Sequence, residues 1–270
     1  MKTRAITGIF FIVVMLGSVL LGSVPFFVFY LLLSLFCLYE FYGLNDKSGI
    51  KPNKVTGFIN AAFIYIIFAF ITHQDSPVLT KILLLLTLTL SAVFIQELFK
   101  ISVAPFTNIA YTFLGLIFIV IPFTFFHALA YLGVNFNFHI PLAFLLMLWA
   151  NDTGAYLVGM SIGRTKLFER HSPKKTWEGF IGGVVISAGV GLIVSHYFTE
   201  LDWKHWVSVA ILISFFGTLG DLIESMFKRS INVKDSGGIL PGHGGLLDRF
   251  DGFLLAAPIV YTYLYFVVNV

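Results

Sequence analysis

The chain has 270 residues, of which 58% are hydrophobic and 11% are charged, and its formal net charge is +3 at pH 7. A soluble domain of this length would show polar faces at helical or strand period, whereas most segments here are apolar on all sides. The composition therefore excludes an ordinary soluble globular protein and gives no support to nucleic-acid binding. It predicts an all-α, polytopic integral membrane protein, because the alternating pattern of a transmembrane barrel is missing.

Apolar runs long enough to cross a bilayer recur along the chain. We predict about nine transmembrane helices, at residues 5–21, 26–42, 55–72, 78–98, 104–132, 140–162, 179–197, 205–223 and 250–269. The first run is expected to be a retained span rather than a signal peptide, because a second apolar run follows at once. The first two spans are short and joined by a turn, which predicts a tight hairpin or a poorly spanning pair. Pro105 and Pro122 predict a kink or break in the fifth.

Basic residues alternate between the segments that connect these spans. With the N-terminus inside, the outer segments retain only Lys81 and Lys204 among the Lys and Arg residues. Cytosolic loops of membrane proteins carry such an excess of positive charge. The pattern predicts a cytosolic N-terminus and an outer C-terminus in the cell (inner) membrane. It also places the two long polar loops, 163–178 and 224–249, in the cytosol.

The sequence shows neither an internal repeat nor a linker to a second soluble domain. Residues 1–100 are predicted to form N-terminal transmembrane helices with a structural or lipid-facing role. Residues 101–270 are predicted to form the catalytic transmembrane region that carries both loops, with an active site at the cytosolic face. The single cysteine, Cys37, excludes an intrachain disulfide and a cysteine-based metal site.

Three groups of ionisable residues lie in or against the apolar spans. Asp152 is in the middle of the sixth span, where a carboxylate should be paired, protonated or bound to a cation. At the end of the eighth span, one helical face carries Asp221, Glu224, Ser225 and Lys228. Ordinary pairs between residues four apart are an alternative for this second group. The neighbouring glycines instead favour the close approach of a backbone or a ligand.

The third group opens the last span. Asp248 and Asp251 are three residues apart and share a face, so they can bind one or two divalent cations, although acidic residues are also common in a first helical turn. The glycine-rich run 237–245 precedes them and can turn its N–H groups toward an anion, with a flexible linker as the alternative. The 163–178 loop adds Lys166, Arg170, His171, Lys174 and Lys175. Alone they are typical of the positive charge of cytosolic loops, and beside a carboxylate–metal centre on the same face they become candidate phosphate ligands.

Residues 225–251 resemble the signature of the phosphatidate cytidylyltransferases, also called CDP-diacylglycerol synthases. The matching residues are Ser225, Lys228, Arg229, Lys234, Asp235, Pro241, His243, Gly244, Gly245, Asp248, Arg249 and Asp251. The blocks 152–156, 172–179 and 220–225 look like the same family, so the resemblance covers roughly residues 140–255. The usual P-loop, dinucleotide-binding and zinc-protease motifs are missing from the sequence.

The resemblance implies a Mg²⁺-dependent transfer of CMP from CTP to phosphatidic acid, giving CDP-diacylglycerol and pyrophosphate for phospholipid biosynthesis. One or two Mg²⁺ ions, CTP, phosphatidic acid and membrane lipid are the cofactors and partners it implies, and dimerisation fits a small polytopic enzyme. Such a reaction depends on positioning and charge neutralisation more than on covalent chemistry by the protein.

On this resemblance each charged residue receives an expected role. The expected metal ligands are Asp221, Asp248 and Asp251, with Asp152 as a ligand or its partner. The residues expected to hold the triphosphate or the lipid phosphate are Lys174, Lys175, Lys228, Arg229, Lys234 and Arg249. Ser225 belongs to the expected substrate-binding set, and the turn with His243, Gly244 and Gly245 is expected to cradle the nucleotide phosphates.

Two other functions remain open from the residues. A secondary transporter would use Asp152, Asp221 and Asp251 as ion-coupling carboxylates, although most of the charge lies at the predicted cytosolic rim and inverted repeats are not evident. A CTP-dependent polyprenol kinase or a related lipid cytidylyltransferase would need similar acidic and basic clusters. The acceptor lipid separates these enzymes from one another.

Overall fold

The computed structural model describes residues 2–71, 77–133, 135–233, 236–237 and 244–267. They divide into two compact units. The first unit comprises Met1–Val134 and Asp235–Asp248, and the second comprises Asn135–Lys234 and Arg249–Val270. The predicted division of roles near residue 100 stays a prediction.

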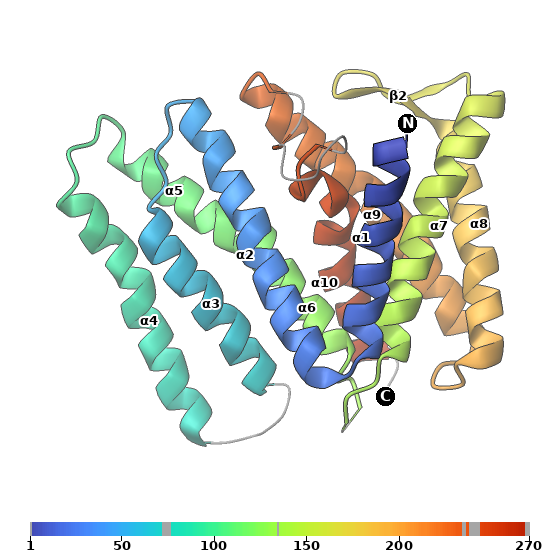
Figure 1. Cartoon of the computed structure of the whole chain (residues 1–270), viewed down its shortest axis with the longest axis horizontal. Helices are drawn as coiled ribbons and strands as arrows, with labels where there is room; N and C mark the ends of the chain where they lie inside the picture. Colours follow the sequence, from blue (N-terminus) through green and yellow to red (C-terminus); the bar gives the residue numbers. More distant parts are fainter. Residues whose placement is uncertain (1, 72–76, 134, 234–235, 238–243, 268–270) are drawn as a thin grey trace. The chain divides into compact units, whose positions relative to one another are not determined.

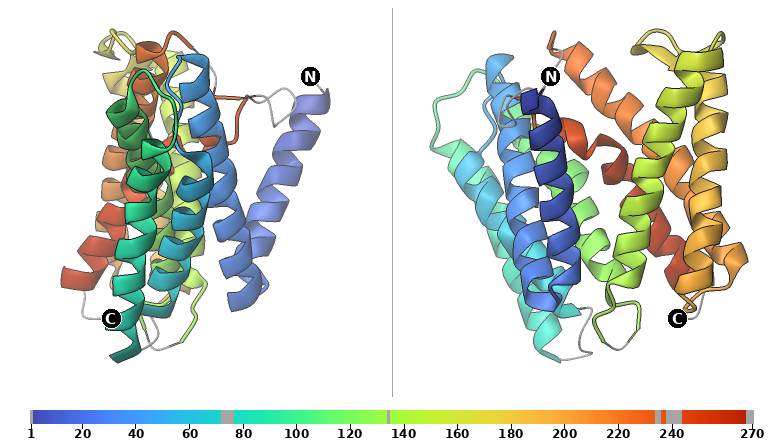
Figure 2. Two further views of the ribbon diagram at one scale, coloured as in Figure 1. Left: turned by 90° about the vertical axis from the view of Figure 1, so that its left-hand side faces the viewer. Right: turned by 45° about the vertical axis from the view of Figure 1, so that its right-hand side comes forward.

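The first unit is built from helices that follow one another in the chain (Figure 1). They are α1 (Lys2–Leu20), α2 (Ser23–Lys47), α3 (Lys54–Ile71), α4 (Pro77–Leu98), α5 (Pro105–Gly115), the π-helical turn η1 (Leu116–Val120) and α6 (Ile121–Leu129). A tight turn at Gly22, whose φ is +106°, joins α1 to α2, a conformation that favours glycine. Helices α3 and α4 lie side by side (Figure 2).

The second unit combines four helices with a small hairpin. Its elements are α7 (His139–Ile162), β1 (Lys166–Phe168), β2 (Ser172–Thr176), α8 (Trp177–Tyr197), α9 (Trp203–Ser230) and α10 (Asp251–Val267). A short 3₁₀ turn, η2 (Leu247–Arg249), precedes α10. The two strands pair antiparallel, with Lys166 opposite Thr176 and Phe168 opposite Ser172.

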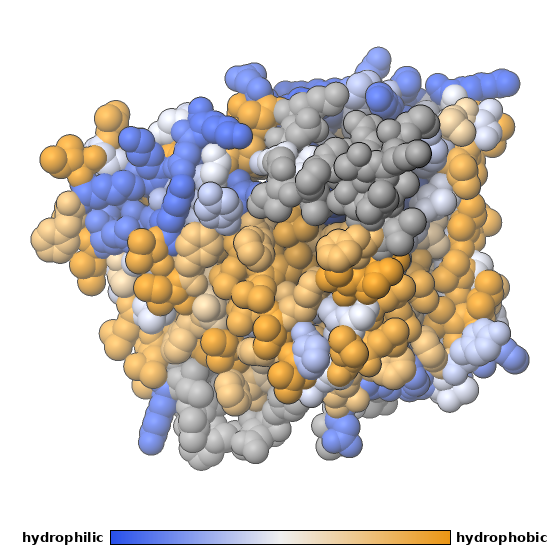
Figure 3. Space-filling model, in the orientation of Figure 1, coloured by the Kyte–Doolittle hydropathy of each residue, from blue (hydrophilic) through white to orange (hydrophobic). Residues whose placement is uncertain are grey.

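The helical class predicted from the sequence is confirmed, and helices lie over each of the nine predicted ranges. Five helices within the described part of the chain are long and apolar enough to cross a membrane: Ser23–Lys47, Pro105–Leu129, His139–Ile162, Trp177–Tyr197 and Trp203–Ser230. On the face shown in Figure 3, apolar side chains cover much of the helical surface and hydrophilic side chains gather near helix ends. The count of nine crossings and the orientation stay predictions.

Two local features differ from the simplest expectation. The fifth range is not broken at Pro122, because the π-helical turn η1 ends at Val120 and α6 begins at Ile121, so the chain continues as helix through Pro122. A π turn relieves the conflict between the proline ring and the preceding turn of a regular helix. The 163–178 loop carries the β1–β2 hairpin, which its basic composition did not indicate.

Small residues allow the helices of the second unit to approach closely. A Cβ atom added at Gly154 of α7 would lie 3.2 Å from the Cα of Gly183 on α8. A Cβ added at Gly220 of α9 would lie 2.5 Å from the carbonyl oxygen of Asp251 and 3.2 Å from the Cα of Gly252 on α10. Glycine at such contacts is typical of helix packing in membranes, where close backbone approach replaces the hydrophobic effect.

These contacts predict that Gly220→Ala destabilises the second unit. The added methyl group would meet backbone atoms that cannot rotate away, and such overpacking costs about 1–3 kcal/mol. Gly189→Ala on α8 is the matched control, because nothing lies within 4 Å of its added Cβ. Thermal unfolding in detergent should show a lower midpoint for Gly220→Ala alone. Equal midpoints for the two variants would contradict the close packing of α9 against α10.

Candidate active site

A cavity of about 420 Å³ lies in the second unit, between α7, the hairpin, the start of α8 and α9. Its polar lining comes from Asn151, Asp152, Lys174, Lys175, Thr218 and Asp221. Apolar side chains such as Met160 and Phe180 complete the wall. The cavity thus combines cations and carboxylates with an apolar wall, the mixture that an amphiphilic, phosphate-bearing ligand requires.

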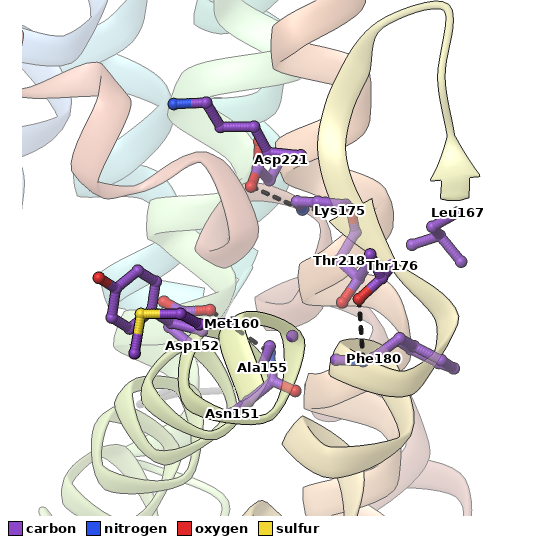
Figure 4. A pocket seen from close by; sticks show the side chains of 14 residues that line it. Asn151, Asp152, Ala155, Met160, Leu167, Lys175, Thr176, Phe180, Thr218 and Asp221 are labelled. Carbon is purple, nitrogen blue, oxygen red and sulfur yellow. Dashed lines mark hydrogen bonds and ion pairs between the residues drawn. The ribbon is translucent and has the colours of Figure 1, made fainter. Parts of the chain in front are cut away.

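Lys175 and Asp221 form the central contact of this cavity. The Lys175 Nζ lies 2.6 Å from the Asp221 Oδ2 and donates a longer hydrogen bond of 3.4 Å to the Thr218 carbonyl oxygen (Figure 4). The Ser225 hydroxyl donates to the Asp221 Oδ1 at 3.2 Å. Both oxygens of Asp221 therefore have partners, and the side chain is held in one orientation.

The hairpin is anchored at both ends, which fixes Lys175 on β2. Thr176 caps α8, because its hydroxyl oxygen accepts the Gly179 N–H at 3.2 Å. The Glu178 carboxylate accepts the backbone N–H groups of Arg164 and Thr165 at 3.0 and 3.1 Å. Side-chain oxygens at a helix start satisfy N–H groups that the helix leaves unpaired. The basic loop is therefore a positioned element that presents Lys174 and Lys175 to the cavity.

Further carboxylates lie near this contact. Asp152 on α7 is exposed toward the cavity, and the Asn151 amide donates to its Oδ1 at 3.4 Å. Asp251 is the first residue of α10, and its Oδ1 accepts the backbone N–H of Gly252 at 2.7 Å. Asp152 and Asp221 line the same cavity, and the Asp251 backbone lies against Gly220, the residue before Asp221, so these carboxylates repel one another. A bound cation would relieve this repulsion.

The donor chemistry suits a hard divalent ion, since the cluster offers carboxylate oxygens and no sulfur. As placed, however, no three His, Cys, Asp or Glu side chains within the described residues converge closely enough to hold a metal ion. The second unit thus brings together three of the four predicted metal ligands, Asp152, Asp221 and Asp251, without a completed coordination sphere.

The remaining basic residues are arranged differently. Lys228 is buried and its Nζ lies 2.7 Å from the Oε2 of Glu224, which is also buried, so the pairing between residues four apart weighed from the sequence is present. Arg229 is exposed, and its Nη1 donates to the Val233 carbonyl oxygen at 3.3 Å. Arg249 is also exposed. None of the three lines the cavity beside Lys175.

Asp248, in the first unit, makes contacts that the sequence did not suggest. Its carboxylate accepts the backbone N–H of Ser236, at 3.1 and 3.0 Å to the two oxygens, and the Gly245 N–H at 2.9 Å. Gly244 adopts a φ of +83°, which favours glycine. Lys234 and His243 lie outside the described residues. Asp248 thus closes a loop, and its role as a metal ligand stays a prediction.

Sequence reasoning missed one residue that contacts this loop. Glu40 lies on α2 in the first unit, and its carboxylate accepts the Leu247 N–H and the Ser236 hydroxyl. The signal was present, because a carboxylate inside the predicted span 26–42 is as costly as Asp152 in its own span. Residues 1–100 were predicted to have a structural or lipid-facing role, and that prediction gave Glu40 no part in the site.

Comparison with known proteins shows the family to which the chain belongs. The model of the cytidylyltransferase family matches residues 2–267. The phosphatidate cytidylyltransferase of Staphylococcus aureus (strain COL) is 37% identical over 263 residues, covering 96% of this chain and 97% of that protein. The phosphatidate cytidylyltransferase of Staphylococcus haemolyticus is 36% identical over 264 residues, with the same coverage. The resemblance seen in the sequence is thereby confirmed, and the chain, an enzyme of the nucleotidyltransferase class, belongs to the cytidylyltransferase family.

Proposed function

We propose that this protein transfers CMP from CTP to phosphatidic acid with the help of Mg²⁺, forming CDP-diacylglycerol and pyrophosphate for phospholipid biosynthesis. The observation that carries the proposal is the Lys175–Asp221 contact in a cavity with an apolar wall. Family membership supplies the reaction class, and the names of the staphylococcal relatives supply the lipid acceptor. The same membership favours an enzyme over the ion-coupled transporter.

The reaction requires two polyanions to meet. An oxygen of the phosphatidate phosphate attacks the α-phosphorus of CTP and forms a new P–O bond. The bond between the α-phosphorus and the bridging oxygen breaks, and pyrophosphate leaves with the electron pair. The phosphate monoester is already ionised near neutral pH, so a strong general base is unnecessary. The protein's contribution is to hold both phosphates in line and to offset their charge.

Lys174 and Lys175 are the residues best placed to bind phosphate in the cavity. In the proposal, the Lys175 ammonium group exchanges part of its contact with Asp221 for a phosphate oxygen, and Asp221 keeps the side chain in the cavity meanwhile. Asp152, Asp221 and Asp251 would hold Mg²⁺, which when bound supplies positive charge to the polyphosphate. The apolar wall near Met160 and Phe180 would accommodate the lipid side of the acceptor.

The membrane arrangement belongs to the same proposal. Nine crossings with the N-terminus in the cytosol would place the 163–178 loop on the cytosolic side of the inner membrane, where CTP is available. The excess of Lys and Arg in the predicted inner segments supports this orientation. The diacyl tails would then enter from the bilayer. A homodimer stays a prediction.

The proposed reaction predicts CTP-dependent release of pyrophosphate that requires both phosphatidate and Mg²⁺. Purified protein in detergent micelles should release pyrophosphate with phosphatidate and much less with diacylglycerol, polyprenol or an ether-linked lipid as the acceptor. Chelation of divalent ions should abolish the release, because the negative charges of the two phosphate groups would then repel one another without a cation between them. Phosphorylation of polyprenol with release of CDP in place of pyrophosphate would favour the kinase, and equal release of pyrophosphate in chelator would overturn the metal requirement.

The Lys175–Asp221 contact predicts that Asp221→Asn lowers kcat/KM by about 100-fold or more, as expected when a preorganised charge at the reacting phosphates is lost. Asp46→Asn is the matched control, because Asp46 pairs with Lys54 on the exposed surface of the first unit, where a single ion pair contributes little. Steady-state assays of both variants provide the comparison. Near-normal activity in Asp221→Asn would remove Asp221 from the site.

The orientation predicts the accessibility of introduced cysteines. Cys37 is buried, so the natural chain gives a low background of thiol labelling. In intact cells, a membrane-impermeant maleimide should label Lys204→Cys and should reach Arg170→Cys only after the membrane is permeabilised. The opposite pattern would show that the 163–178 loop faces outward.

A further inference from the structure

Glu40 is a buried acidic residue that no step of the proposed reaction uses. It lies in the C-terminal half of α2, and only 5% of the residue is exposed. Withdrawing a carboxylate from water costs several kcal/mol unless hydrogen bonds or a cation compensate. Its surroundings should therefore show what compensates the charge.

The compensating groups come from a distant part of the sequence. The Glu40 Oε2 accepts the backbone N–H of Leu247 at 2.7 Å and the Ser236 hydroxyl at 3.3 Å. Both donors are buried and belong to the same compact unit as α2. The 2.7 Å bond has the length of a charge-assisted hydrogen bond. Glu40 therefore contacts the segment 225–251 that carries the family signature, although α2 itself is far from that segment in the sequence.

Two glycines of that segment lie directly against the Glu40 carboxylate. A Cβ atom added at Gly237 would be 2.5 Å from Oε1, and one added at Gly245 would be 2.7 Å from Oε2 and 1.9 Å from the Ser236 Oγ. Either atom would displace the carboxylate or the hydroxyl group. Glycine at these positions is thus explained by close approach to Glu40.

Asp248 holds the same stretch of backbone through other groups. It accepts the N–H of Ser236 and the N–H of Gly245, while Glu40 accepts the hydroxyl of Ser236 and the N–H of Leu247. Ser236 bridges the two carboxylates, and Asp248 follows Leu247 in the chain. Displacing Glu40 would therefore shift the backbone that sets the direction of the Asp248 side chain.

We propose that Glu40 is a positioning residue for the reaction. Its carboxylate fixes residues 236–237 and 244–247 and thereby orients Asp248, without contacting either substrate. The catalytic part of this inference rests on the proposed function, whereas the contact itself does not. A displacement of about 1 Å at a reacting group can cost on the order of 100-fold in rate, which is the scale of effect at stake.

A purely structural role is the competing explanation, and the chain offers a matched control for it. Glu97 is a second buried carboxylate of the same unit, with only 3% of the residue exposed. It accepts the Asn108 amide at 2.7 Å and lies 3.2 Å from the Lys100 Nζ. Its hydrogen-bond and ion-pair partners, Asn108 and Lys100, lie on its own side of the sequence, and none of them belongs to the described residues 236–237 or 244–248. Truncating Glu97 therefore perturbs a buried carboxylate without touching the Asp248 loop.

The test compares Glu40→Ala, Glu40→Gln, Ser236→Ala and Glu97→Ala in the full chain. Turnover per folded molecule and amide hydrogen exchange of the peptide containing Leu247 are measured for each. Glu40→Ala should lose about 10- to 100-fold in kcat and lose protection at Leu247. Glu40→Gln keeps an oxygen acceptor for the Leu247 N–H, so it should retain protection and remain within several-fold of the natural enzyme. Glu97→Ala should lower the unfolding temperature while leaving both readouts unchanged.

If Glu40→Ala does not fold, Ser236→Ala replaces it, because it removes one contact of the Glu40 carboxylate and leaves the Leu247 bond. A several-fold fall in kcat at an unchanged unfolding temperature is then expected. Positioning is overturned if Glu40→Ala and Glu97→Ala lose equal turnover, if Leu247 protection is unaffected, or if Ser236→Ala has normal turnover. If the natural protein shows no transfer to phosphatidate, the proposed function fails, and the exchange data still decide whether Glu40 holds the loop.

Discussion

The structure depends on one constraint: a charged group placed among apolar helices must have a partner of opposite charge or a set of hydrogen bonds. Each charged residue that matters here satisfies it in a different way. Asp221 contacts Lys175 in the lining of a cavity, Glu224 contacts Lys228 where both residues are buried, and Glu40 accepts backbone and hydroxyl donors. Only the first of these arrangements leaves the charges accessible to a ligand.

That difference separates binding chemistry from scaffolding among residues that look alike in the sequence. Lys175 and Lys228 both belong to blocks of the sequence that resemble the family. Lys175 lines the cavity, whereas Lys228 is buried against Glu224. Asp221 and Glu224 are both acidic residues of α9, yet Asp221 contacts Lys175 at the cavity and Glu224 is buried against Lys228. The hairpin explains the first case, because its anchored ends hold Lys175 over α9.

Much of the fold could be predicted, because a long apolar run in a membrane protein indicates a helix that satisfies its own backbone hydrogen bonds. The range 140–162 corresponds closely to α7, and 179–197 to α8. The helical face that carries Asp221, Glu224, Ser225 and Lys228 was predicted, and α9 continues past the predicted end of the span at residue 223 to Ser230, with Glu224 and Lys228 buried. The Glu40 contact could not be predicted, because Glu40 and Leu247 are 207 residues apart in the sequence. The hairpin is local, but its short strands, Lys166–Phe168 and Ser172–Thr176, carry mostly polar and basic residues without an alternating apolar pattern. The sequence grouped Asp152 with Asp221 as intramembrane carboxylates and through the resemblance, and the packing of α7 against α9 supplies the physical reason.

The central claim is that this protein moves the α-phosphate of CTP, with its nucleoside, onto a lipid phosphate. The most direct measurement gives the purified protein CTP labelled either at the α- or at the γ-phosphorus, together with phosphatidate vesicles. The account predicts that α-label appears in the lipid fraction and that γ-label appears only in pyrophosphate. Transfer of γ-label to lipid would identify a kinase and contradict the account, as would the absence of label from the lipid in both reactions.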